Sequence, residues 1–374
     1  MRFYKQIIVC LCGICAMTTD LNAQETAIIA EGYAAMDERG ELVPYRFPRR
    51  PVGERDLLVE ILYCGVCHSD IHEAANDWHY TQYPNVPGHE IVGKVIRTGE
   101  GTSLFRVGDY IGIGGTVVSC GECDMCLAGK EHLCVAPPTP PAEYPVAIGG
   151  YSDKIVVDER YGIHIPKDAP LEKIGPLMCA GITVYSPLKA RVKQGDKVAI
   201  AGFGGLGHMA VRYAVALGAD VTVFDVSEEK RPFALQFGAK QYINVIRPEF
   251  HDVKNRFDYI LTTIPSRYDI APYLRMLKPE GELLLVGLPA EKDGPLINIH
   301  DIPFGARISK WLMGSIRETQ EMVDFSLAYG IMPQVEVIPI QQINEAFRKV
   351  QEGKVQFRYV IDMKSIGHSQ SKDK

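Results

Sequence analysis

Lys197-Val-Ala-Ile-Ala-Gly-Phe-Gly-Gly-Leu-Gly207 is the stretch of this sequence that decides the fold. Its first five residues predict a buried strand, Lys197–Ala201, and the apolar pattern of Gly205–Leu217 predicts a helix. The turn between them consists of Gly202, Phe203, Gly204, Gly205, Leu206 and Gly207. Glycines permit a tight turn and close backbone approach, and the helix N-terminus offers unpaired N–H groups to a pyrophosphate. The stretch therefore predicts a dinucleotide-binding unit.

An acidic residue ends the next predicted strand, Val221–Asp225. Asp225 lies eighteen residues after Gly207, about where a carboxylate binds the ribose hydroxyls of NAD. Its charge would repel the 2′-phosphate of NADP, so we expect NAD to be favoured. Lys230 and Arg231 follow one turn later and would attract that phosphate, which leaves NADP as the alternative.

The alternation of strands and helices extends over residues 181–315. Phe257–Thr262 and Glu282–Val286 have the composition of further buried strands. Strands that alternate with helices predict a parallel, doubly wound α/β sheet, the Rossmann fold.

The chain before residue 180 is predicted to be rich in β-strands instead. Short Val/Ile runs alternate there with Gly, Pro and Asp turns: Leu57–Leu62, Ile91–Ile96, Tyr110–Ile113 and Lys154–Val157. Prolines mark residues 135–146 as a loop. Two helical patterns and a short strand close the chain: Glu318–Tyr329, Ile343–Glu352 and Tyr359–Asp362.

Four cysteines form a compact set with the spacing Cys120-x-x-Cys123-x-x-Cys126-x7-Cys134. This spacing lets one loop surround a tetrahedral metal ion, which is typical of a closed, structural zinc site. Disulfides are the alternative, but adjacent C-x-x-C pairs are poor at cross-linking distant elements.

A second set of metal-binding side chains lies between residues 64 and 90. Cys-Gly-Val-Cys-His-Ser-Asp-Ile-His covers 64–72 and contains Cys67, His68, Ser69, Asp70 and His72. His89 and Glu90 follow in Val-Pro-Gly-His-Glu. Thiolate and imidazole are the ligands of a zinc ion with an open position, and Cys179 is the best candidate for a third ligand. The alternative is that each cysteine is a small buried hydrophobe.

Length and composition exclude several classes of protein. The 374 residues suffice for two domains with separate cores, and 46% hydrophobic and 23% charged residues are ordinary for a globular protein. A net charge of -6 gives no reason to expect a nucleic acid or an anionic membrane surface as partner. No apolar run reaches the roughly 18 residues that a spanning helix needs.

The N-terminus has the pattern of a secretory signal over residues 1–23. Arg2 and Lys5 precede the apolar run Ile7–Met17, and Ala23 offers a cleavage site. We therefore predict an exported, periplasmic protein; the alternative is a tail or a translated upstream segment on a cytoplasmic one. Three of the ten cysteines lie in the leader, and two metal sites would leave only Cys64 free. The absence of a disulfide framework is unusual for an exported protein.

Taken together, these motifs resemble those of the zinc-dependent medium-chain alcohol dehydrogenases, in the cinnamyl-alcohol-dehydrogenase-like branch. The matching stretches are Cys-Gly-Val-Cys-His-Ser-Asp at 64, Val-Pro-Gly-His-Glu-Ile-Val-Gly at 86, Gly-Gly-Tyr-Ser at 149, Cys-Ala-Gly-Ile-Thr-Val-Tyr-Ser-Pro-Leu at 179, Gly-Phe-Gly-Gly-Leu-Gly-His at 202 and Glu-Thr-Gln-Glu-Met at 318. The resemblance covers nearly all of residues 27–363. It implies a GroES-like catalytic domain built from both chain ends, residues 27–180 and 316–374, beside the Rossmann domain.

The resemblance also implies a role for each site residue. Cys67, His89 and Cys179 match the ligands of a catalytic zinc ion, and Glu90 matches a carboxylate that can approach it. Asp70 matches the partner that orients His89, and Ser69 and His72 match a proton relay. His68 matches a residue at the cofactor pyrophosphate, and Thr183 matches one near the nicotinamide. Two zinc ions per chain and a homodimer or homotetramer are expected.

The expected activity is hydride transfer between a nicotinamide cofactor and primary alcohols or aldehydes, with aromatic ones among the candidates. The sequence departs from the family at the leader, at Asp225, and at Lys310-Trp311, where the family has Gly-Ser. The substrate is therefore less constrained than the chemistry. Polyol or formaldehyde oxidation, and a catalytically silent binding protein, are the alternatives.

Overall fold

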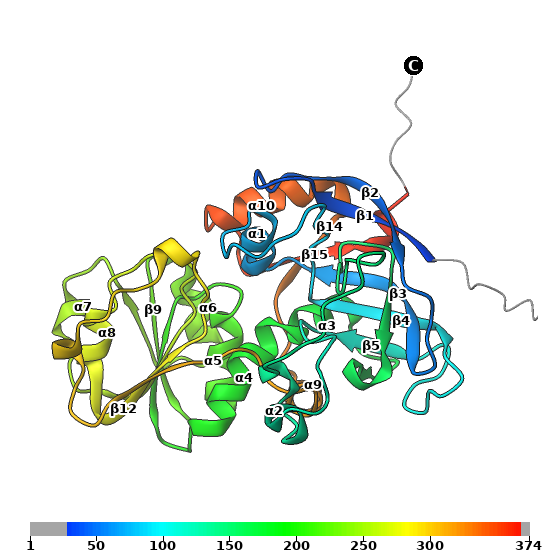
Figure 1. Cartoon of the computed structure of the whole chain (residues 1–374). Coiled ribbons are helices and arrows are strands. Elements are labelled where there is room, and N and C mark those ends of the chain that lie inside the picture. Colours follow the sequence, from blue (N-terminus) through cyan, green and yellow to red (C-terminus); the bar gives the residue numbers. More distant parts are fainter. Residues whose placement is uncertain (1–27, 368–374) are drawn as a thin grey trace, which may run out of the picture.

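The computed structural model describes residues 28–367, which form two lobes (Figure 1). The green and yellow lobe contains one six-stranded sheet, and the other lobe joins the blue and cyan first part of the chain to its red end. The predicted leader and the expected start of the first strand at Thr26 lie outside the described residues. In the described range, no helix is both long and apolar enough to cross a membrane.

The six-stranded sheet is entirely parallel and has the order β10-β9-β8-β11-β12-β13. Its strands are β8 (Lys197–Ala201), β9 (Asp220–Asp225), β10 (Gln241–Asn244), β11 (Phe257–Thr262), β12 (Leu277–Leu285) and β13 (Arg307–Lys310). The chain runs outward from β8 to β10 and then crosses to β11 on the other side of β8. Ligands bind at such a switch point, beyond the carboxyl ends of the strands. This arrangement confirms the predicted fold class.

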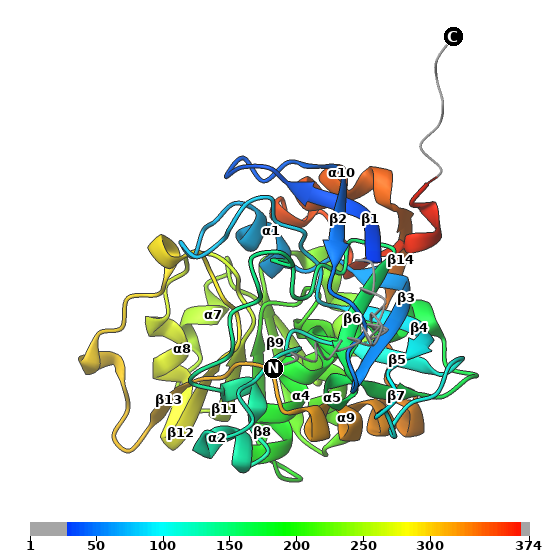
Figure 2. The same ribbon diagram turned by 45° about the vertical axis from the view of Figure 1, so that its right-hand side comes forward.

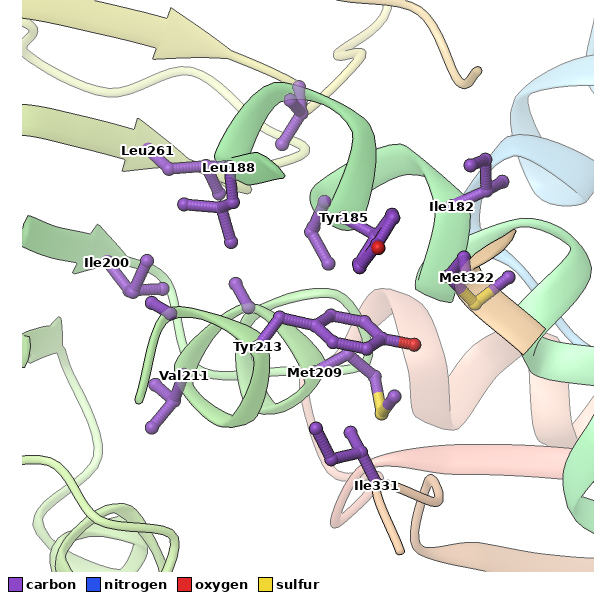
Figure 3. Packing of buried hydrophobic residues seen from close by; sticks show 14 of the residues in the cluster. Ile182, Tyr185, Leu188, Ile200, Met209, Val211, Tyr213, Leu261, Met322 and Ile331 are labelled. Atoms are coloured by element: carbon purple, nitrogen blue, oxygen red, sulfur yellow. The ribbon is translucent and has the colours of Figure 1, made fainter. Parts of the chain in front are cut away.

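Helices cover this sheet, and only the one after the glycine-rich turn was predicted individually from the sequence. They are α4 (Ala180–Arg191), α5 (Gly207–Ala216), α6 (Arg231–Gln236), α7 (Glu249–Asp252) and α8 (Ala271–Met276). Figure 3 shows Tyr185 of α4 and Tyr213 of α5 facing each other, with ring centroids 5.2 Å apart. Every residue of α4 from Ala180 to Leu188 is buried, so the helix has no polar face and no helical period in its sequence.

The other lobe has a seven-stranded sheet to which both ends of the chain contribute. Its order is β14-β15-β3-β4-β5-β7, with β6 paired to β3, and the hairpin β1-β2 forms a separate small sheet. The strands are β1 (Ile28–Ala35), β2 (Leu42–Arg49), β3 (Asp56–Gly65), β4 (Ile91–Thr98), β5 (Tyr110–Ile113), β6 (Lys154–Asp158), β7 (Ile163–Ile165), β14 (Val335–Pro339) and β15 (Arg358–Asp362). The helices are α1 (His68–Ala74), α2 (Asp124–Leu127), α3 (Leu171–Ile174), α9 (Ile316–Tyr329) and α10 (Ile343–Gln351). Pairing of Val360 with Gly65 puts the chain's end beside the metal-binding segment.

Candidate active site

A cavity of about 810 Å³ is lined by residues of both lobes. Cys67, His89 and Cys179 line it together with the glycine-rich turn at Gly202 and with Asp225. The metal-binding side chains and the predicted cofactor turn therefore open into one space, of a size typical for small-molecule sites.

The short helix α1 carries much of the functional set. It begins after Cys67, whose backbone N–H donates to Asp70 Oδ2 (2.8 Å). Its seven residues include His68 and Ser69, which line the cavity, and the buried Asp70 and His72. α1 is a short helix in an otherwise β-rich region, and the Asp70 carboxylate closes its first turn on the Cys67 N–H.

Cys67, His89 and Cys179 converge from three separate elements. The Sγ atoms of Cys67 and Cys179 are 4.0 Å apart, and His89 Nε2 is 3.2 Å from the Cys179 sulfur. Glu90 belongs to the same group, in which all ligand atoms lie within 4.8 Å of one another. Four-coordinate zinc with Zn–S bonds of ~2.3 Å needs sulfur atoms about 3.8 Å apart, so these donors fit a zinc ion.

The electrostatics favour the thiolate form of Cys67, whereas the hydrogen bond with Cys67, followed by burial, raises the pKa of Cys179 well above its usual range. A hydrogen bond from Cys179 and the nearby Arg358 guanidinium hold the pKa of the Cys67 thiol well below its usual range, in spite of burial. Burial alone would lower the pKa of His89, but the Asp70 carboxylate holds it well above its usual range.

Asp70 is fully buried and accepts four hydrogen bonds. Oδ1 accepts from His89 Nδ1 (2.8 Å) and from the backbone N–H of Gly88 (3.0 Å). Oδ2 accepts from the Tyr151 hydroxyl (2.7 Å) as well as from Cys67. These contacts fix the His89 ring with Nε2 toward the two sulfurs, which is how an outer carboxylate orients a metal-binding histidine.

Glu90 is fully buried against Arg358, with 3.2 Å between Oε1 and Nη2. Burial raises the pKa of Glu90 to about 8 although Arg358 opposes the shift. Arg358 also donates to the Val66 carbonyl (2.9 Å) and lies against Gly205, where an added Cβ would meet its Cζ at 3.0 Å. Arg358 thus links the metal-binding group to the glycine-rich turn.

His72 contacts a carboxylate that sequence reasoning did not single out. Its Nδ1 lies 2.7 Å from Asp77 Oδ2, and its buried Nε2 has no hydrogen-bond partner in the part of the chain that the structure describes. The ring of His68 lies 5.0 Å from that of His72. Burial and the neighbouring His72 lower the pKa of His68 to about 4, so His68 is neutral at pH 7.

The four-cysteine loop forms a second, separate group. Sulfur–sulfur distances are 3.5 Å for Cys123–Cys126, 3.6 Å for Cys134–Cys120 and 3.8 Å for Cys120–Cys126. None of these cysteines forms a disulfide. Backbone N–H groups of Cys126 and Val135 lower the pKa of Cys123 to about 6, which favours its thiolate, whereas burial raises the pKa of Cys126 to about 11. These donors also fit a tetrahedral zinc ion.

At the other end of the cavity, the turn requires its glycines. Gly202 has a φ of +88°, and a Cβ on Gly207 would lie 2.0 Å from the Gly202 carbonyl oxygen. Asp225, at the end of β9, accepts from the backbone N–H groups of Phe203 (2.6 Å) and Ser227 (2.9 Å). Its Oδ1 is 4.0 Å from Lys230 Nζ.

Two further residues near the cofactor turn can be placed. Thr183 is buried on α4 and lines the cavity. His208 lies at 3.1 Å from the Gly204 carbonyl through Nδ1, and its Nε2 accepts from the Gln334 N–H (3.3 Å). Burial lowers the pKa of His208 to about 3, so this neutral ring acts in packing.

Comparison with known proteins follows the same division of the chain. Residues 53–167 match the family model for the alcohol dehydrogenase GroES-like domain. Residues 205–328 match that for the zinc-binding dehydrogenases.

Individual relatives are similar over most of their length. Mannitol dehydrogenase of Apium graveolens is 42% identical over 347 residues, which cover 91% of this chain and 95% of the relative. 8-hydroxygeraniol dehydrogenase of Catharanthus roseus is 41% identical over 351 residues, 91% of this chain and 96% of the relative. A CAD from Helicobacter pylori, solved in complex with NADP(H), superposes with a TM-score of 0.86 at 44% identity, covering 91% of this chain and 99% of that structure.

Proposed function

Since this chain belongs to the zinc-dependent medium-chain alcohol dehydrogenases of the cinnamyl-alcohol-dehydrogenase-like branch, we propose that it interconverts primary alcohols and aldehydes, aromatic ones included. The observation that carries this proposal is the meeting of Cys67, His89 and Cys179 in the cavity that also contains the glycine-rich turn. An alcohol or aldehyde whose oxygen lies beside these three side chains would share the cavity with a nicotinamide cofactor bound at the glycine-rich turn.

We assign Cys67, His89 and Cys179 to the catalytic zinc ion and the four-cysteine loop to a structural one. When bound, the catalytic ion supplies Lewis acidity that lowers the pKa of an alcohol hydroxyl. Asp70 holds the His89 ring in place, and Arg358 holds the Glu90 carboxyl group beside the donors. The catalytic domain is proposed to comprise residues 27–180 and 316–374.

Ser69 and His72 are proposed to remove the substrate proton. They lie three positions apart on α1, so they share one face of that helix. Asp77 holds Nδ1 of His72, which leaves the unpartnered Nε2 to take up a proton. His68 is neutral and would donate a hydrogen bond to the pyrophosphate rather than a charge.

NAD is proposed as the preferred cofactor because the Asp225 carboxylate is fixed at the end of β9 by two backbone N–H groups. Asp225→Ser should narrow or reverse a preference for NADH over NADPH, by roughly tenfold or more, since the repulsion of the 2′-phosphate is lost. Initial rates with both cofactors measure this ratio. A clear preference of the wild-type enzyme for NADPH would show that Lys230 and Arg231 decide the choice.

The activity itself is tested with initial rates against aliphatic and aromatic aldehydes, using protein whose zinc content has been measured. We expect turnover with both classes. Protein that contains two zinc ions per chain and reduces none of these aldehydes with either cofactor would contradict the proposal.

A homodimer is proposed from the free edge of the parallel sheet. β13 is one of the two edge strands, and the segment before it, which extends to the left in Figure 2, exposes Leu296 (92%) and Phe304 (98%). An unpaired edge beside exposed apolar side chains is suited to two-fold pairing with a second copy. Light scattering after size-exclusion chromatography tests it, and a monomeric mass would overturn it.

Export is proposed from the leader alone: its basic start, apolar run and Ala23 predict cleavage before Gln24. Mass spectrometry of the protein from its native host decides it. An intact peptide spanning Ala23–Gln24 in the abundant form would place the enzyme in the cytoplasm.

A further inference from the structure

Glu73 lines the cavity, and none of the roles proposed above involves it. It is not assigned to a metal ion, to the cofactor or to the proton relay. Three carboxylate residues line the cavity, and two of them are already engaged. Asp225 accepts from two backbone N–H groups, and Glu352 pairs with Arg348 (2.9 Å) and Lys354 (2.8 Å). Glu73 forms no ion pair with any residue in the described range 28–367.

Only one oxygen of Glu73 is occupied. Oε1 accepts from Asn85 Nδ2 at 3.2 Å, and Oε2 accepts no hydrogen bond from the described part of the chain. Burial, followed by the charge of Asp70, raises the pKa of Glu73. Glu73 is half-buried and lines the cavity, so a ligand that carries a hydrogen-bond donor can replace water at this acceptor.

Glu73 lies one helical turn from Ser69, where the reacting end of a substrate is proposed to bind. Ser69 and Glu73 are four residues apart on α1 and lie on one face of that helix, about 6 Å apart along its axis. Ser69 is the proposed first acceptor of the substrate proton. A substrate oxygen at Ser69 therefore leaves the rest of the molecule within reach of Glu73, roughly one helical turn away.

Apolar and aromatic side chains make up much of the cavity wall. The ring of Trp78 stacks on that of Tyr80 at 5.9 Å, and Trp78 Nε1 donates to the Pro289 carbonyl (3.1 Å), which fixes the indole. Further lining residues are Ile148, Leu288, Leu312 and Met313. Few polar groups in an apolar wall usually set the orientation and specificity of a ligand.

We propose that Glu73 selects alcohols and aldehydes that carry a second hydrogen-bond donor, a hydroxyl or an ammonium group, and disfavours those that carry a carboxylate. The inference rests on the proposed function, because it needs the reacting oxygen at the Ser69 end of α1. Glu73 is then a specificity-determining residue, and its Oε2 accepts from the far end of the substrate.

Four substrates of equal chain length test the proposal: butan-1-ol, butane-1,4-diol, 4-aminobutan-1-ol and 4-hydroxybutanoate. kcat/KM is measured at pH 7.5 with zinc-loaded wild-type enzyme, Glu73→Leu and the nearly isosteric Glu73→Gln. At this pH the amine is protonated and the acid ionised. Zinc content and the unfolding midpoint of each variant show whether it is folded.

We expect the wild-type enzyme to prefer the diol and the amino alcohol to butan-1-ol, and to use 4-hydroxybutanoate least. Glu73→Leu should reduce the first two preferences by roughly 10- to 100-fold, the range for a hydrogen bond to a charged acceptor, without reducing kcat/KM for butan-1-ol. Glu73→Gln should retain part of the preference for the diol, lose that for the amino alcohol, and improve turnover of 4-hydroxybutanoate.

Equal changes of all four values in both variants would overturn the inference, because Glu73 would then only support the loop at Asn85. Unchanged ratios would overturn it as well. Zinc-loaded wild-type enzyme that oxidises none of the four alcohols and reduces none of the aldehydes would instead overturn the proposed function and, with it, this inference.

Discussion

The two cysteine groups offer similar ligands to a metal ion but are built in different ways. Cys120, Cys123, Cys126 and Cys134 come from one loop and are all partly exposed. Cys67, His89 and Cys179 come from the start of α1, the end of the loop before β4 and the start of α4, and both of these cysteines are buried. The loop surrounds its metal with four thiolates, whereas the buried group has three firm donors and one side open to the cavity.

This difference separates the tasks of stabilising and reacting. A closed set of four thiolates leaves no position for a substrate, so its binding energy goes into holding the loop. The open set depends on the surrounding fold for its geometry and on Asp70 for the orientation of His89. Loss of a ligand should therefore have opposite consequences at the two sites.

The largest effect is expected for Cys67→Ala. The variant loses a buried thiolate ligand but keeps the backbone N–H that donates to Asp70, so α1 keeps its cap. kcat/KM should fall by at least ~1000-fold, since Lewis-acid stabilisation of several kcal/mol is lost. Elemental analysis should give one zinc ion per chain, and circular dichroism should show an unchanged fold. Two zinc ions and retained activity would remove Cys67 from the ligand set.

Cys123→Ala should act on stability instead. It opens the four-thiolate loop, whose Glu131 carboxylate accepts from the backbone N–H of Ile316 at the start of α9. We expect the thermal midpoint to fall by roughly 10 °C, while kcat of the folded fraction stays within about threefold of wild type. Calorimetry and initial rates below the transition measure both. A loss of activity as large as that of Cys67→Ala would abolish the contrast between the sites.

The same contrast explains how much of the molecule can be predicted from its sequence. The four-cysteine loop is predictable because its donors are close in sequence, and β5, β8 and β11 have the bounds expected from their continuous apolar runs. The features that cannot be predicted depend on contacts between residues far apart in the sequence. Arg358 donates to Val66, 292 positions away, and no local pattern announces that pairing.

Two helices, α4 and α1, are not predicted from the sequence, each for its own reason. α4 is buried on all sides, so its sequence lacks the polar–apolar alternation by which a helix is recognised. α1 is seven residues long and carries functional side chains in place of an apolar stripe. Glu73 gains its significance only once α1 is known to be a helix, because one helical turn brings it toward Ser69, and Asp77 gains its own from the turn after α1, which places it against His72.

Asp70→Asn sharpens the comparison at the open site. Each carboxylate oxygen of Asp70 accepts two hydrogen bonds, and the four donors are on His89, Gly88, Cys67 and Tyr151. The asparagine side chain replaces one of these oxygens with an NH₂ group, which cannot accept and which faces two donors. We expect zinc affinity or kcat to fall by roughly 10- to 100-fold, as for other partners of metal-binding histidines. Chelator titration measures the affinity, and the zinc ion of the four-cysteine loop serves as the internal control. Equal weakening of both ions would indicate a general loss of stability.

The smallest effect is expected for Tyr151→Phe, which removes one of the four hydrogen bonds to Asp70 (2.7 Å) and keeps the packed ring. Asp70 Oδ2 then retains only the N–H of Cys67, so the carboxylate holds His89 less firmly. One hydrogen bond to a charged group contributes about 1.5–3 kcal/mol, and part of this is recovered by relaxation, so zinc release from the open site should accelerate by roughly tenfold or less. Release kinetics with a chromogenic chelator resolve the two ions because only one phase should change. If the slow phase of the four-cysteine loop accelerated instead, Tyr151 would act on the stability of the lobe, and the two sites would not be as independent as their construction indicates.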